Sequence, residues 1–252
     1  MNIPSYLTRL NYSASVKPDA ETLHGLQSAH LLTIPFENLD IGLKRPIQLS
    51  EEALCDKIIL GKRGGFCYEL NGLFAWLLKE IGFDVTYLNA HVFNREGNLG
   101  IDFDHLALLV RIPQESIWLA DVGFGDSFHE PLSFEERGEQ AQGLRAYRLE
   151  QTSSGYITWQ RNYDGTWERQ YFFDLQPHNF PADYESACLY HQTSSDSSFT
   201  RRSIISKATL DGRISLEAGR LIITTNGKRE ERLVANAEEY ETLLKDHFGV
   251  VL

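Results

Sequence analysis

Residues 63–82 read RGGFCYELNGLFAWLLKEIG, the segment with the clearest structural pattern in the chain. Arg63 to Phe66 have the composition of a turn, because two glycines follow the arginine. Downstream, the apolar residues recur with helical spacing, at Leu70, Leu73, Phe74, Leu77, Leu78 and Ile81. Gly82 then supplies the usual stop signal of a helix. The pattern predicts a buried helix that begins at Cys67.

Helices precede this stretch and strands follow it. Pro18-Asp19 and Ser50 are helix start signals, which predict one helix that carries Leu23, Leu26 and His30 and a second through Ile59. Segments of period two, bounded by turn residues, predict strands at 85–93, 105–112, 117–122, 147–151, 156–161 and 167–173. These strands indicate an antiparallel barrel or sandwich, and residues 135–143 between them have the composition of a loop.

The last third of the chain mixes both kinds of element. A short helix is predicted at 182–190, hairpins turn at Asp211-Gly212 and Asn226-Gly227, and a final helix runs over 237–247. Because helical and strand segments are grouped along the chain, we expect the α+β class.

The composition is that of a globular protein with an acidic surface. The chain has 252 residues, 42% of them hydrophobic, and a formal net charge of −11 at pH 7. This charge repels a phosphate backbone, so nucleic acid is not an expected partner. No apolar run approaches the ~20 residues of a membrane span, and the start lacks a signal-peptide pattern. We therefore expect a cytoplasmic protein with no membrane partner.

The cysteines lie far apart, at Cys55, Cys67 and Cys188, and form neither a disulfide framework nor a zinc motif. The histidines show no paired metal-binding spacing either, so no metal is expected. A thiol reacts as its thiolate, and a helix N-terminus or a nearby imidazolium lowers its pKa below ~8.5. Cys67 has the first by position, although a buried structural cysteine explains this residue equally well.

A predicted hairpin supplies a base and a carboxylate that orients it. If Arg111 pairs with Ile117, Ala107 faces Asp121, and His105 lies diagonally from Asp121 on the same face. His105 then accepts the thiol proton and Asp121 orients the ring, as in a catalytic triad. A slip of one residue separates the two, and a core histidine with a turn aspartate is the alternative interpretation.

Three segments together resemble the arylamine N-acetyltransferase family: IPFENLD at 34–40, RGGFCYELNG at 63–72, and His105 followed by DVGFG at 121–125. A weaker likeness, including HQTSSDSSF at 191–199, extends over almost the whole chain. The resemblance implies a helical bundle at 1–83, an antiparallel β-barrel at 84–180 and an α/β lid at 181–252. It also implies a cysteine-protease-like core in which Cys67, His105 and Asp121 are catalytic.

The resemblance further implies a ping-pong reaction with acetyl-CoA as co-substrate. Acetyl-CoA acetylates Cys67, CoA leaves, and an arylamine, arylhydrazine or N-hydroxyarylamine accepts the acetyl group. The aromatic acceptor pocket of the family carries over to Phe36, Phe66, Phe103 and Phe124.

Three further expectations accompany this resemblance. Arg9 and Glu37 resemble a salt bridge that supports the site. Ser195 stands where the family motif has proline, so the CoA-binding residues stay unassigned. The acidic surface suits a monomer or a small homo-oligomer.

Two other enzymes use the same three residues. A Cys-His-Asp amide hydrolase must admit water, whereas the phenylalanines near Cys67 favour a site that protects a thioester from water. A pathway-specific amide synthase keeps the triad and changes the pocket. A non-catalytic binding module has no need of Cys67, His105 and Asp121 together, so the sequence favours the acetyltransferase.

Overall fold

The computed structural model describes residues 2–113 and 115–252, and its N-terminal part is helical. The helices are α1 (Ile3–Arg9), α2 (Ala20–Thr33), α3 (Leu39–Gly42), α4 (Glu51–Leu54), which a π-helical segment (Cys55–Leu60) continues, and α5 (Cys67–Ile81). The Asp19 side chain caps α2 by accepting a hydrogen bond from the Thr22 N–H. Gly82 ends α5 in the left-handed conformation, with φ of 108°. The predicted start of this helix at Cys67 is therefore confirmed.

The central part is one antiparallel sheet in the order β5-β4-β3-β2-β9-β8-β7-β6. Its strands are β2 (Asp84–Val92), β3 (His105–Arg111), β4 (Ile117–Ala120), β5 (Leu132–Ser133), β6 (Gln140–Gln142), β7 (Arg145–Gln151), β8 (Tyr156–Arg161) and β9 (Trp167–Phe173). Six of these were predicted to within two residues at each end. The loop expected at 135–143 is wrong in part, because β6 lies within it.

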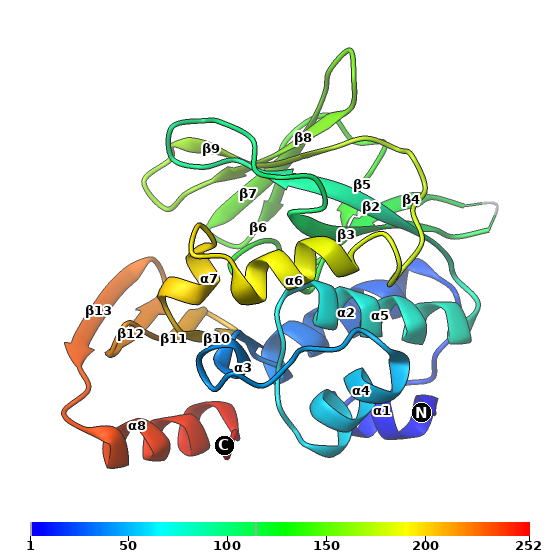
Figure 1. Cartoon of the computed structure of the whole chain (residues 1–252). Coiled ribbons are helices and arrows are strands. Elements are labelled where there is room, and N and C mark those ends of the chain that lie inside the picture. The colour runs from blue at the N-terminus through cyan, green and yellow to red at the C-terminus, as the bar shows by residue number, and fades with distance from the viewer. Residues whose placement is uncertain (1, 114) are drawn as a thin grey trace.

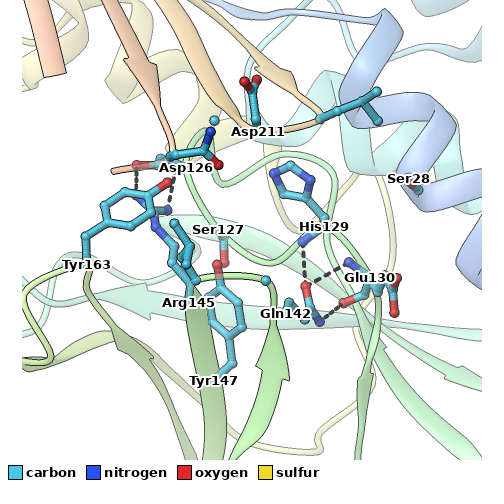
Figure 2. Close-up of a pocket in the computed structure, with 15 residues that line it drawn as sticks. Ser28, Asp126, Ser127, His129, Glu130, Gln142, Arg145, Tyr147, Tyr163 and Asp211 are labelled. Atoms are coloured by element: carbon cyan, nitrogen blue, oxygen red, sulfur yellow. Dashed lines mark hydrogen bonds and ion pairs between the residues drawn. The ribbon is translucent and has the colours of Figure 1, made fainter. Parts of the chain in front are cut away.

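Side chains close the gap between the two edge strands of this sheet. The Gln140 side chain donates to the Ser133 carbonyl at 3.0 Å and accepts from the Ser133 N–H at 2.8 Å. Gln142 makes equivalent bonds with the backbone of His129 and Glu130 (Figure 2). The edges are therefore covered without a backbone ladder. The result is a nearly closed barrel, which decides between the barrel and the sandwich.

The C-terminal part holds a smaller sheet and the remaining helices (Figure 1). Its elements are α6 (Glu185–Thr193), α7 (Ser198–Arg201), β10 (Ile204–Thr209), β11 (Gly212–Glu217), β12 (Arg220–Thr225), β13 (Lys228–Leu233), α8 (Ala237–Leu243) and a π-helical segment (Leu244–Phe248). The β12–β13 hairpin turns at the predicted Asn226-Gly227, whereas the β10–β11 turn falls one residue before the prediction, at Leu210-Asp211, because Thr209 pairs with Gly212. The short strand β1 (Phe36–Glu37) from the N-terminal part pairs with β10. Phe36 of β1 also forms a bridge with Gly65, so β1 connects the small sheet to the loop just before Cys67.

The helix α5 lies at the centre of the largest hydrophobic core. Leu70, Leu73 and Leu77 are fully buried on it, and the helix packs against β3 and β2. Separate apolar clusters fill the barrel and the space between α8 and the small sheet. Among the helices of residues 2–113 and 115–252, none is long and apolar enough to cross a membrane.

His30 makes the core sensitive to acid. Its ring is fully buried between Tyr6 and Phe74, and neither ring nitrogen has a hydrogen-bond partner among residues 2–113 and 115–252. Burial lowers the pKa of His30 from 6.5 to about 3. Below pH 6.5 the unfolded chain therefore binds a proton that the folded protein excludes, and stability is lost as the pH falls toward 3.

We expect His30→Phe to remove this loss. The wild-type free energy of unfolding should fall by about 2 kcal/mol from this group between about pH 6.5 and about pH 5. Urea unfolding at both pH values measures the change, with His24→Phe, a partly exposed position on the same helix, as control. An unchanged pH dependence in His30→Phe would contradict the assignment, whatever the effect of the larger ring on packing.

Candidate active site

The N-terminus of α5 places Cys67 against the small sheet. The loop before it is pinned because the Glu37 N–H donates to the Gly65 carbonyl at 2.8 Å. Gly64 has no room for a side chain, since a Cβ would collide with the Pro35 carbonyl oxygen. The Glu69 carboxylate caps the helix by accepting from the Phe66 N–H at 3.1 Å. Cys67 is thus the first helical residue, at the positive end of the helix dipole.

A buried ionic cluster holds this loop. Arg63 donates to Glu37 at 2.8 and 3.0 Å and to Asp40 at 3.1 Å, while Lys57 lies 2.8 Å from Asp40 and 2.7 Å from Glu69. Burial raises the pKa of Glu69 to about 7, and the positive charge of Lys57 opposes that shift.

The expected Arg9–Glu37 salt bridge is wrong. Glu37 pairs with Arg63, and Arg9 donates instead to the carbonyls of Ile58, Lys62 and Arg63, at 2.9 to 3.3 Å. The reason is that Arg63 lies on the loop before Cys67, and this loop is held next to Glu37 by the hydrogen bond from the Glu37 N–H to the Gly65 carbonyl. Arg9 thus supports the end of this loop through backbone contacts.

The predicted hairpin register brings His105 to Asp121. Arg111 pairs with Ile117 and Leu108 with Ala120, as expected from the sequence. Just beyond the ladder, Nε2 of His105 lies 2.7 Å from Oδ2 of Asp121, and both residues are 2% exposed. Because Nε2 faces the carboxylate, Nδ1 is the ring nitrogen left for another partner.

Asn71 and Gly123 fix the other oxygen of Asp121. Oδ1 accepts from Asn71 Nδ2 and from the Gly123 N–H, each at 2.8 Å. Asn71 also accepts from the Val122 N–H at 2.9 Å, so it ties α5 to the segment after β4. A Cβ on Gly123 would lie 2.8 Å from the Cys67 Cα, so only glycine permits this approach.

Cys67 and His105 line one cavity of about 210 Å³. Phe36 and Phe124 are part of its wall, and the Phe124 ring meets the His105 ring edge to face at 5.1 Å. Phe199, from the segment 191–199, completes the aromatic wall. The structure therefore brings together all three predicted polar residues and two of the four predicted phenylalanines.

Phe66 and Phe103 lie elsewhere. Phe66 is fully buried and packs edge to face on Tyr68, and Phe103 packs on Tyr184. Neither lines the Cys67 cavity within the described residues. Sequence reasoning had instead missed the wall residues Val92, Asp104, His191, Ser198 and Phe199. The motif at 191–199 was the signal that pointed to three of these.

The Cys67 thiol is not activated by its position alone. Burial raises the pKa of the Cys67 thiol well above its ordinary value, while the backbone N–H of Leu106 acts in the opposite direction. This differs from the pKa decrease expected from a helix N-terminus, because water is excluded from the sulfur. A thiolate in this cavity therefore needs a base that takes the proton at short range.

A wider cleft adjoins this cavity. It measures about 420 Å³ and shares Phe36, Phe124 and Phe199 with the Cys67 cavity. Three arginines also line it, at Arg202, Arg213 and Arg229. A separate cavity of about 280 Å³ lies between α2, β7 and the β10–β11 turn, where Arg145 holds Asp126 at 2.7 Å (Figure 2). The arginine-lined cleft is thus the one that opens toward Cys67.

Comparison with known proteins identifies the class. A family model described as N-acetyltransferase matches residues 19–252. An arylamine N-acetyltransferase of Mycolicibacterium smegmatis is 32% identical over 257 residues, which cover 100% of this chain and 93% of the relative. A pineal gland isozyme from Gallus gallus with the same activity name is also 32% identical, over 100% of this chain and 95% of the relative.

Solved structures agree with this result. The arylamine N-acetyltransferase of Mycobacterium marinum superimposes with a TM-score of 0.92 at 31% identity, over 99% of this chain and 93% of that one. Its complex with CoA gives the same values. The chain belongs to the arylamine N-acetyltransferase family and is an acyltransferase.

Proposed function

We propose that the protein carries an acetyl group from acetyl-CoA to an aromatic amine on the sulfur of Cys67. The observation that carries this proposal is the single cavity in which Cys67, at the start of α5, meets His105 held by Asp121. The relatives and their structures support the acetyl transfer, and the CoA complex of the M. marinum enzyme supports the donor.

The first step forms the thioester. The Cys67 sulfur attacks the acetyl carbonyl carbon of acetyl-CoA while Nδ1 of His105 takes the thiol proton. Asp121 stabilises the imidazolium that results, through Nε2. Backbone N–H groups at the start of α5 stabilise the negative oxygen. The bond from the carbonyl carbon to the CoA sulfur then breaks, and CoA leaves with the proton from His105.

The second step releases the product. The nitrogen of the acceptor attacks the thioester carbonyl, and His105 takes a proton from that nitrogen. The bond to the Cys67 sulfur breaks, the sulfur takes the proton from His105, and the acetylated amine is released. Phe36, Phe124 and Phe199 form apolar walls around the thioester, and such walls limit attack by water.

The arginine-lined cleft is the proposed position of the CoA phosphates. Arg202, Arg213 and Arg229 line it. Each guanidinium is paired with a carboxylate, at 2.9 Å from Glu217, 3.1 Å from Asp126 and 2.8 Å from Glu231. A guanidinium has five N–H donors, so it can bind a phosphate oxygen beside its carboxylate partner. The two cavities share Phe36, Phe124 and Phe199, so we place the pantetheine arm past these rings on its way to Cys67.

The acceptor class and the parts of the chain follow the same proposal. A relative from Salmonella typhimurium, 41% identical over 68% of this chain and 60% of its own length, is named for both arylamine and N-hydroxyarylamine transfer. We extend that acceptor range, with arylhydrazines, to this chain.

The proposed domains are residues 1–83 with Cys67, residues 84–180 with His105 and Asp121, and residues 181–252 as the lid. The proposed compartment is the cytoplasm, where free thiols such as Cys67 persist.

Intact-protein mass spectrometry tests the proposal. Mixing the protein with acetyl-CoA alone should add one acetyl group, mapped by peptide analysis to Cys67. Adding 4-methoxyaniline should remove the adduct and form the acetylated amine in equal amount. An adduct lost equally fast without amine would instead establish an acyl hydrolase. No adduct on a folded protein would favour the amide hydrolase or the pathway-specific amide synthase.

A further inference from the structure

Asp104 and His191 form a second acid–base pair in the Cys67 cavity, and the proposed acetyl transfer uses neither. Asp104 is the residue just before β3, and His191 lies on α6. Both line the cavity of about 210 Å³ that contains Cys67 and His105. Two segments far apart in the chain thus place polar groups in a wall that also holds three phenylalanine rings.

The Asp104 carboxylate has few partners for a largely buried charge. Oδ2 accepts one long hydrogen bond, of 3.3 Å, from the Val92 N–H. Oδ1 lies 3.2 Å from Nε2 of His191, yet this nitrogen makes no hydrogen bond of normal geometry with any residue that the structure describes. A carboxylate has about four acceptor sites, so most of this capacity is free. The side chain is 17% exposed, which leaves those sites open to a molecule in the cavity.

His191 holds a fixed position beside this carboxylate. Its Nδ1 lies 3.1 Å from the Ser197 hydroxyl, and its ring packs edge to face on Phe199 at 5.3 Å. In the part of the chain that the structure describes, His191 is the one basic side chain within ion-pair distance of Asp104. The pair therefore carries a net charge of zero or −1, depending on the His191 proton, and presents carboxylate oxygens in both states.

We propose that the Asp104–His191 pair selects the acceptor. It favours aromatic amines whose ring carries a hydrogen-bond donor, such as a hydroxyl or a second amino group, and it disfavours amines that carry a carboxylate. This inference rests on the proposed function, because the acceptor must reach the Cys67 thioester inside this cavity.

The size of the cavity brings the substituents of a bound ring close to its wall, of which Asp104 is part. A void of ~150 Å³ holds one benzene molecule. A cavity of about 210 Å³ therefore has room for one substituted ring, whose substituents must lie against its wall. A donor on the ring can satisfy the free Asp104 oxygens, whereas a second carboxylate meets like charge at low solvent exposure. Such repulsion changes kcat/KM by about tenfold.

Two pairs of acceptors isolate this effect. In the first pair, 4-aminobenzoate and its methyl ester differ in charge but share an electron-withdrawing carbonyl. In the second pair, 4-aminophenol and 4-methoxyaniline differ in one donor but share an electron-donating oxygen. The measured quantity is kcat/KM for each acceptor at saturating acetyl-CoA. The variant is Asp104→Asn, and the control is Asp102→Asn, a carboxylate two residues away whose side chain is 82% exposed.

The wild type should prefer the ester over 4-aminobenzoate, and Asp104→Asn should reduce this preference by about tenfold. The same variant should reduce the preference for 4-aminophenol over 4-methoxyaniline by about fivefold. The reason is that the charged carboxylate of Asp104, which accepts the hydrogen bond of the phenol, is replaced by a neutral amide oxygen. Asp102→Asn should keep both ratios.

Two results would overturn the inference while leaving the proposed function intact. One is a set of Asp104→Asn ratios within about twofold of the wild type. The other is an equal loss for all four acceptors, which indicates a purely structural role. If the wild-type protein forms no thioester, or its thioester acetylates none of the four amines, the proposed function fails first.

Discussion

The Cys67→Ala variant should lose acetyl transfer completely and keep the native fold. No other described group in the Cys67 cavity is a thiol, so the variant has no sulfur on which the acetyl group can rest. We expect a loss of at least about 10⁴-fold in kcat/KM, the scale on which removal of a covalent nucleophile acts. The fold should persist because the exchange removes one sulfur atom at the edge of the core, where Cys67 is 4% exposed.

Cys188→Ala is the matched control for this variant. Cys188 is a second buried thiol, 2% exposed, on α6, and burial raises its pKa to about 12. It lies outside the Cys67 cavity, so its loss should leave transfer unchanged. Turnover by Cys67→Ala above the uncatalysed rate, or an acetyl adduct on that variant, would remove the covalent route. Circular dichroism and thermal unfolding establish that both variants are folded.

Local sequence signals predicted the elements that carry Cys67, His105 and Asp121. The helix at Cys67 followed from apolar spacing and from Gly82, both of which act within a few residues. The His105–Asp121 contact followed from one assumed register, Arg111 opposite Ile117, across a short connection; the structure has that register, although the apolar strand β3 does not by itself specify it. Both predictions depended on neighbours in the chain, and the structure confirms both.

Contacts between distant segments could not be predicted in the same way. The Gln140 side chain bonds to the Ser133 backbone and joins the two edge strands of the barrel, but the short polar segment around Gln140 has no periodicity that predicts this contact. Glu37 pairs with Arg63 rather than with Arg9 because the loop before α5 lies alongside β1, where Phe36 bridges Gly65, and this is a property of the assembled fold. Asp104 reaches His191 across 87 positions of the chain. Such pairs depend on packing between parts, and the sequence specifies them only through the whole structure.

The aromatic wall shows the same limit. Four phenylalanines were expected around Cys67, and the structure places Phe66 in the core because its backbone precedes the helix while its ring turns toward Tyr68. Phe199 comes instead from α7, packing at 5.8 Å on Phe66 and at 6.2 Å on Phe36. Phe199 thus lines the cavity where Phe66 was expected, and the residue type alone does not tell which phenylalanine faces the cavity.

The Asp121→Asn variant should lower kcat/KM by about 10⁴-fold, as loss of the orienting carboxylate does in other triads. The two donors on Oδ1 explain why. Asn71 Nδ2 and the Gly123 N–H both point at that atom, so an asparagine must place its carbonyl oxygen there. Its NH2 group then faces Nε2 of His105, which must accept a hydrogen bond and lose its proton to Nδ1. In that tautomer Nδ1 cannot accept the thiol proton.

The same variant should change how the thiol responds to pH. Because burial raises the pKa of Cys67, a thiol without its base forms thiolate only above the ordinary value of about 8.5. Iodoacetamide should therefore alkylate wild-type Cys67 rapidly near neutral pH, whereas in Asp121→Asn the rate should be low there and rise as the pH increases. Asp164→Asn, an exposed carboxylate in the β8–β9 turn, is the control. If Asp121→Asn reacts with the wild-type pH profile, His105 does not depend on Asp121 for its tautomer, and the triad interpretation is wrong.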